Sequence, residues 1–138
     1  MSLKNEKIII LIIGIILGLL SVIARLSVLG WLFMLGLITT GVFGLIHLFF
    51  LGKINNLFNR LNKKEKQMAW LGVIIFPLIF LFQFDFDDTP GSFYIYEYLT
   101  GEGDSGFKQY GFYLAIVAAI IYIANLIIWL RKIKRLKS

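Results

Sequence analysis

The 138-residue sequence contains no cysteine and a single histidine, His47. Without cysteine the chain has no disulfide, no thiolate ligand for a metal and no cysteine nucleophile. One imidazole without other ligands at its depth does not complete a metal or haem site in one copy of the chain, so we expect no cofactor. A homo-oligomer that brings several copies of His47 together would be a second arrangement.

Charged residues are also scarce. They make up 16% of the chain, whereas 59% is hydrophobic and the mean hydropathy is +0.83. An average soluble domain is about 45–50% apolar and about 25% charged, so a chain of this length cannot hide its apolar side chains in one small core. The same balance excludes disorder. The composition predicts a membrane protein.

Four long uncharged runs account for most of the apolar residues, and they lie at 8–24, 26–52, 68–84 and 109–130. A helix needs about 20 residues to cross the hydrocarbon of a bilayer. The runs are apolar at every position, which excludes the alternating strands of a membrane barrel. We therefore expect an all-α four-transmembrane-helix bundle that forms a single integral membrane domain over 1–138. The predicted spans are about 6–25, 28–51, 64–84 and 108–130.

The charges predict the orientation of these spans. Twelve of the 14 Lys and Arg residues precede the first span, separate the second from the third, or follow the fourth; six of the eight acids lie in 85–108. Basic residues in short loops stay in the cytoplasm, so both termini should be cytoplasmic in an inner membrane. The basic clusters should then meet anionic lipid headgroups rather than nucleic acid. The expected lipid contacts are Lys63, Lys64, Lys66, Arg131, Lys132, Lys134 and Arg135.

The first run also resembles a secretory signal, because Lys4 and Lys7 precede it and Val22-Ile23-Ala24 at its end would pass as a cleavage site. Its apolar stretch is longer than the usual 7–15 residues or so of such signals, and it leads directly into another span. We expect it to be retained.

Two connections have local signals. The chain must reverse around 25–30, with Ser27 as an N-cap of the second helix. Between the second and third spans, apolar residues recur at helical spacing, which predicts a short amphipathic helix at the interface or an extension of the second span. Asn62 and Glu65 have the spacing of a capping box at the start of the third helix. The apolar residues of the amphipathic stretch are Ile54, Leu57, Phe58 and Leu61.

The outer segment 85–108 is acidic and aromatic, and the pattern of its aromatic part, 92–99, fits either a helical turn or a strand. Its tyrosines and phenylalanine favour the membrane–water boundary. A lone charge near lipid is costly, so we predict an ion pair between Arg25 and either Asp85 or Asp87 on the outer side.

Small residues form stripes at helical spacing on three of the predicted helices. Close approach over small side chains drives helix packing in lipid. We favour packing inside one bundle, and three stripes leave room for one to face a partner. The proposed packing residues are Gly14, Gly18, Ser21, Gly36, Thr40, Gly44, Gly111, Ala115, Ala118 and Asn125, with Arg25, His47 and Tyr122 on the same faces.

No acidic residue lies inside any of the four uncharged runs, which disfavours an ion-coupled pump. The polar residues available for a pathway are Thr39, Thr40, His47 and Asn125. The four residues at 103–106 match the surroundings of a serine-protease nucleophile, but no histidine base is expected on their side of the membrane. We therefore expect no enzymatic activity.

These observations favour a non-enzymatic subunit or interaction partner within a larger membrane complex. One alternative is a homo-oligomeric channel or small-solute transporter. Another is a membrane component of a defence or immunity system. The expected partners are membrane lipids, further copies of the chain or other membrane subunits, and the inner basic clusters could instead dock an acidic cytosolic protein.

Overall fold

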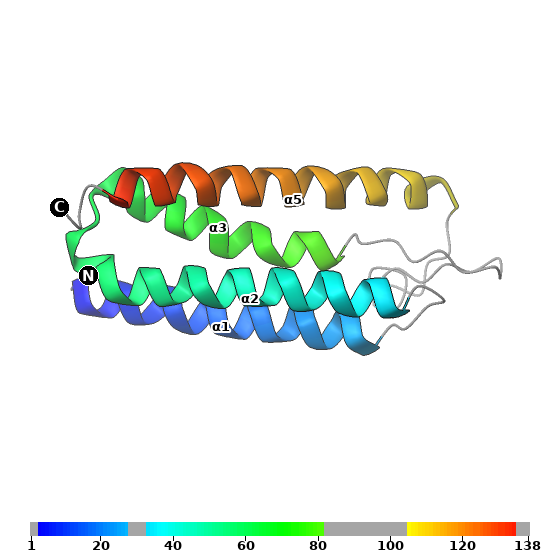
Figure 1. The fold of residues 1–138 in the computed structure, drawn as a ribbon, viewed down its shortest axis with the longest axis horizontal. Helices are drawn as coiled ribbons and strands as arrows, with labels where there is room; N and C mark the ends of the chain where they lie inside the picture. The colour runs from blue at the N-terminus through cyan, green and yellow to red at the C-terminus, as the bar shows by residue number, and fades with distance from the viewer. Residues whose placement is uncertain (1–2, 28–32, 82–104, 135–138) are drawn as a thin grey trace.

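The computed structural model describes residues 3–27, 33–81 and 105–134, and these form four α-helices with one short 3₁₀ turn. The helices are α1 (Leu3–Ser27), α2 (Phe33–Leu57), α3 (Lys63–Leu81) and α5 (Ser105–Lys134), and the turn is η1 (Phe58–Arg60). Successive helices run in opposite directions, so α1 begins, α5 ends and α2 passes into α3 at the same end of the molecule (Figure 1). The described part of the chain is therefore all-helical.

Three of these helices are long and apolar enough to cross a membrane, over Lys4–Arg25, Leu37–Arg60 and Tyr113–Lys134. The described part of α3 opens with four charged residues in a row and contains Pro77. Many large aliphatic side chains on α1, α2 and α5 are exposed; Leu45, for example, is 69% exposed. Soluble monomers rarely expose continuous apolar surface of this extent. The protein is therefore membrane-associated.

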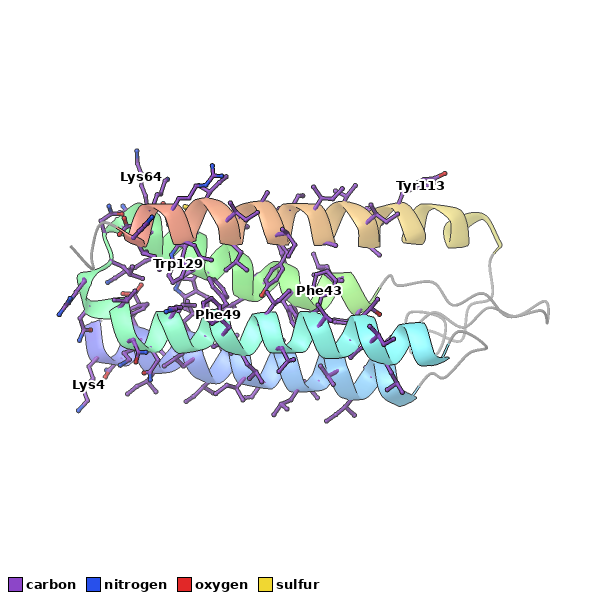
Figure 2. All side chains as sticks on the ribbon, in the orientation of Figure 1. Lys4, Phe43, Phe49, Lys64, Tyr113 and Trp129 are labelled. Carbon is purple, nitrogen blue, oxygen red and sulfur yellow. The ribbon has the colours of Figure 1, made fainter. Side chains whose placement is uncertain are left out.

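Side-chain size decides how the four helices pack. Helix α1 packs against α2 and α3, and α3 packs against α5. Helices α2 and α5 meet mainly through aromatic side chains, among them Phe50 and Trp129 with ring centroids 5.0 Å apart. Figure 2 shows Trp129 between the helices, whereas Lys4 and Lys64 extend outwards near the end where α1 begins. Small residues thus permit the close pairs, and aromatic rings fill the wider gap.

The capping box predicted at the start of the third helix is confirmed. The backbone N–H of Glu65 donates to the Asn62 side-chain oxygen at 2.9 Å, and the N–H of Asn62 donates to the Glu65 carboxylate at 2.9 Å. The indole of Trp129 donates to the Glu65 carbonyl at 3.0 Å, so α5 is attached to this same turn.

One local prediction was wrong, and two that were left open are decided in whole or in part. Ser27 ends α1 and does not cap α2, which begins at Phe33. Of the two alternatives for the amphipathic stretch, the extension of the second span is confirmed and the separate interfacial helix is wrong, because α2 continues to Leu57 and passes into η1. Its apolar face is buried against the core, so burial keeps it attached to the bundle. The segment 85–108 is partly helical, since α5 begins at Ser105; its remainder, 85–104, lies outside the described residues.

Two glycines provide a test of this packing. A Cβ atom on Gly72 would lie 2.7 Å from a ring carbon of Phe50, whereas a Cβ on Gly52 would meet nothing within 4 Å. We expect Gly72→Ala to lower the free energy of unfolding by about 1–3 kcal/mol through overpacking. Gly52→Ala should raise it by up to about 1 kcal/mol, because alanine is the better helix former. Thermal unfolding in detergent measures both, and a gain in stability for Gly72→Ala would contradict the described packing.

Candidate functional site

The polar centre of the bundle is His47, which is 2% exposed. Its Nε2 lies 3.2 Å from the backbone oxygen of Gly14 on α1, and its Nδ1 lies 3.1 Å from the hydroxyl of Tyr122 on α5. A carbonyl can only accept, so Nε2 carries a proton, and in the neutral imidazole that apolar surroundings favour, Nδ1 accepts from the tyrosine. His47 is thus a neutral imidazole whose two hydrogen bonds join three helices.

Aromatic rings surround this histidine. Its ring stacks on Phe76 with centroids 3.9 Å apart and an interplanar angle of 16°. Phe43 and Phe80 meet edge to face at 6.4 Å, and Phe76 and Phe80 at 5.2 Å. Such pairs add stability beyond the area they bury. The rings shield His47 from solvent, and this burial favours a structural role for the imidazole.

The glycine pair predicted as a packing motif lies directly beside His47. A Cβ on Gly18 would lie 3.1 Å from the imidazole, and a Cβ on Gly14 would lie 2.5 Å from a methyl carbon of Leu51. Both positions are buried. The absence of side chains there lets α2 approach α1 closely enough for His47 to reach the Gly14 carbonyl.

Most of the remaining positions on the small-residue stripes lie in the interior. Ser21, Arg25, Thr40, Ala115, Ala118 and Asn125 are buried, and Gly44 is half-buried. Ser21 donates to the Leu17 carbonyl of its own helix at 2.6 Å. The surroundings of Gly36 and Gly111 lie outside the described residues.

Asn125 secures the seam between α3 and α5. Its side-chain nitrogen donates to the backbone oxygen of Met68 at 2.9 Å, and Gly72 leaves the space that the amide occupies. Of the proposed pathway residues, His47 therefore forms hydrogen bonds with α1 and α5, and Asn125 forms one with α3. Thr40 is buried and Thr39 half-buried, so the four do not gather on one outward face.

The predicted ion pair of Arg25 stays a prediction. Arg25 is 5% exposed near the end of α1, and Asp85 and Asp87 lie outside the described residues. Among 3–27, 33–81 and 105–134, no three His, Asp or Glu side chains come together in a way that could hold a metal ion.

A groove of about 420 Å³ runs between α1 and α2. Gly14, Gly18, Gly41 and Gly44 line it together with aliphatic side chains, and the edge of His47 reaches it. Gly41 is exposed, and a Cβ there would meet nothing within 4 Å. The volume of the groove is within the usual range of about 300–1,000 Å³ for ligand pockets, and its walls are almost wholly apolar.

A second pocket, of about 330 Å³, lies where α1 and α3 begin, and it is lined by Glu6, Lys63, Lys66, Gln67 and Trp70. Lys66 forms a salt bridge with Glu6 at 3.3 Å. Other predicted lipid-contact residues at this end are also exposed, namely Lys64, Arg131, Lys132 and Lys134, while Arg135 lies outside the described residues.

Sequence reasoning placed His47 on an inward face but did not find its partner Tyr122, nor the bond from Trp129 to the Glu65 carbonyl. Each links residues more than 60 positions apart. The available signal was position: α2 and α5 run in the same direction (Figure 1), and His47 and Tyr122 lie at similar distances from the helix ends at Leu57 and Lys134.

Comparisons with protein-family models, with curated proteins and with solved structures find no match to this chain. Any function proposed for it therefore rests on its own geometry.

The hydrogen bond between Tyr122 and His47 can be tested by removing one hydroxyl. Tyr122→Phe leaves Nδ1 of His47 without its donor in apolar surroundings, and we expect a loss of about 1–3 kcal/mol in the free energy of unfolding. Tyr113→Phe removes a hydroxyl from a side chain that is 55% exposed and should change stability by less than about 0.5 kcal/mol. Chemical unfolding in detergent micelles compares the two; equal losses would show that the buried bond contributes nothing specific.

Proposed function

We propose that this protein is a small multi-pass integral membrane protein that acts as a non-enzymatic subunit or interaction partner within a larger membrane complex. Its four helices would each cross the membrane, with both termini on the cytoplasmic side of an inner membrane. The alternation of helix direction and the basic residues at the end where α1 begins support this orientation.

The observation that carries the proposal is the open glycine surface of α2. The buried small residues of α1 and α5 are already engaged inside the bundle, whereas Gly41 faces outwards beside the groove between α1 and α2. Elsewhere the outward positions of α1 and α5 carry mostly large aliphatic side chains, which suit lipid. In a membrane, a glycine-lined surface permits the close backbone approach that drives helix association. We infer that a transmembrane helix of a partner occupies this groove.

A homo-oligomeric channel has less support. The residues suited to line it, Thr40, His47 and Asn125, are buried within one copy. The side chains of His47 and Asn125 form hydrogen bonds with neighbouring helices. A channel would require these bonds to be broken in favour of water, which costs free energy. The subunit hypothesis needs no such rearrangement.

The docking surface can be tested with one pair of variants. Gly41→Leu should add a side chain beside the groove at a position where a Cβ meets nothing within 4 Å and prevent the partner helix from approaching, so the partner should be lost on purification in native nanodiscs. Ala124→Leu adds bulk at an exposed position of α5 and should leave the complex intact. Mass spectrometry of what travels with each variant gives the readout. Equal retention of all partners by both variants, or wild-type protein that purifies alone as a monomer, would contradict the proposal.

The orientation can be tested because the chain has no cysteine, so each introduced cysteine is unique. A membrane-impermeant maleimide should label Ser92→Cys in intact cells, because that residue belongs to the outer segment. Ser138→Cys should react only after permeabilisation. Labelling of both variants in intact cells would contradict the membrane crossing by α5 that separates the two positions.

A further inference from the structure

The pocket where α1 and α3 begin combines charges of both signs with an aromatic ring. It is lined by Glu6, Lys63, Lys66, Gln67 and Trp70. Lys63 and Gln67 are exposed, whereas Glu6, Lys66 and Trp70 are half-buried. The two ammonium groups outnumber the single carboxylate, so the pocket has a net charge of one positive unit.

Lys66 is held in place by two contacts. Its ammonium group lies 3.3 Å from the Glu6 carboxylate and 4.7 Å from the centre of the Phe58 ring, and its side chain is 14% exposed. A cation over an aromatic face is attracted by the negative charge density of the ring. These contacts hold the Lys66 ammonium group in place before a ligand binds. Less side-chain entropy is then lost on binding.

Lys63 supplies the second positive charge from the first turn of α3. Glu65, in the same turn, is 1% exposed, and its carboxylate accepts from the Asn62 N–H at 2.9 Å. The carboxylate of the capping box is therefore turned towards the backbone and does not line the pocket, whereas Lys63 does.

Trp70 and Gln67 set the depth of the pocket. Both lie about one to two turns further along α3 than Lys63, towards its apolar part. Tryptophan is enriched where headgroups meet hydrocarbon, and its indole can donate one hydrogen bond. In the proposed orientation, the charged rim of the pocket lies at the level of lipid phosphates and Trp70 lies just below.

We propose that this pocket binds the phosphodiester of an anionic phospholipid of the phosphatidylglycerol type, with Lys63 and Lys66 facing the phosphate. The inference rests on the proposed membrane orientation. The single positive excess matches one phosphodiester charge. A phosphatidylethanolamine headgroup would bring an extra ammonium towards Lys63, and the one carboxylate that could receive it is already paired with Lys66.

Native mass spectrometry of the full-length protein in detergent, titrated with phosphatidylglycerol or phosphatidylethanolamine of the same acyl chains, tests this site. We expect wild-type protein to bind phosphatidylglycerol more tightly. Lys63→Gln should weaken that binding about fivefold, which corresponds to about 1 kcal/mol for one lysine at a membrane surface. Lys64→Gln is the matched control: it removes the same charge from the adjacent exposed position, which does not line the pocket, and should change binding less than about twofold.

Glu6→Gln should have the opposite effect on the affinity for phosphatidylglycerol. It releases Lys66 and adds one unit to the net charge of the pocket, so phosphatidylglycerol should bind more tightly, by up to about fivefold. Equal losses for Lys63→Gln and Lys64→Gln would overturn the proposal in favour of diffuse attraction to the basic end. Equal affinity of the wild type for the two lipids would overturn it as well.

These results are separable from the proposed function. A protein that retains its membrane partner through Gly41 but shows no headgroup preference would contradict the lipid site alone. A protein that binds phosphatidylglycerol through Lys63 but has no partner helix would support the lipid site and contradict the role in a complex.

Discussion

The hydrogen bond between His47 and the backbone of Gly14 is the contact on which much of this structure depends. In apolar surroundings a polar group without a partner is costly, so the imidazole needs acceptors and donors from neighbouring helices. Gly14 and Gly18 bring α1 close enough to supply one of them, and Tyr122 on α5 supplies the other. One polar side chain thereby fixes the relative depth of three helices, and the aromatic rings around it fill the space that remains.

The same requirement explains the seam between α3 and α5. Asn125 and Trp129 lie one helical turn apart, and each donates to a backbone carbonyl in the first two turns of α3. Backbone carbonyls near the start of a helix already accept hydrogen bonds from N–H groups of the same helix. The side-chain donors therefore act as second partners, and their bonds add directional contacts to an otherwise apolar interface. Packing alone would leave the register of two apolar helices weakly specified; the two donors select one register.

With His47 and Asn125 hydrogen-bonded inside the bundle, the molecule presents two different surfaces. The groove between α1 and α2 is apolar and bordered by an open glycine, which suits a helix in lipid. The pocket at the start of α1 and α3 is charged and carries a tryptophan, which suits the headgroup region. The proposed role in a complex belongs to the first surface and the proposed lipid site to the second. Neither requires movement of the buried hydrogen bonds.

Part of this arrangement could be predicted from local pattern. The capping box of Asn62 and Glu65 depends on residues three positions apart, and the burial of Gly14, Gly18 and Ser21 follows from helical spacing. Predictions that depended on where a helix ends were less secure. Ser27 has the chemistry of an N-cap, yet it is the last residue of α1 and α2 begins at Phe33, because a helix end is decided by packing as well as by the local residue.

By itself the sequence determined the helical and membrane character of this chain, because those properties follow from composition and from the length of its uncharged runs. It also determined which small residues share a helix face. Only the tertiary structure decided that Tyr122 is the partner of His47, that Gly41 stays open while Gly18 is covered, and that Glu6 meets Lys66 across 60 positions. Those outcomes depend on the rotation and depth of one helix against another, which are set by many weak contacts summed over whole interfaces and are not encoded in any short stretch of residues.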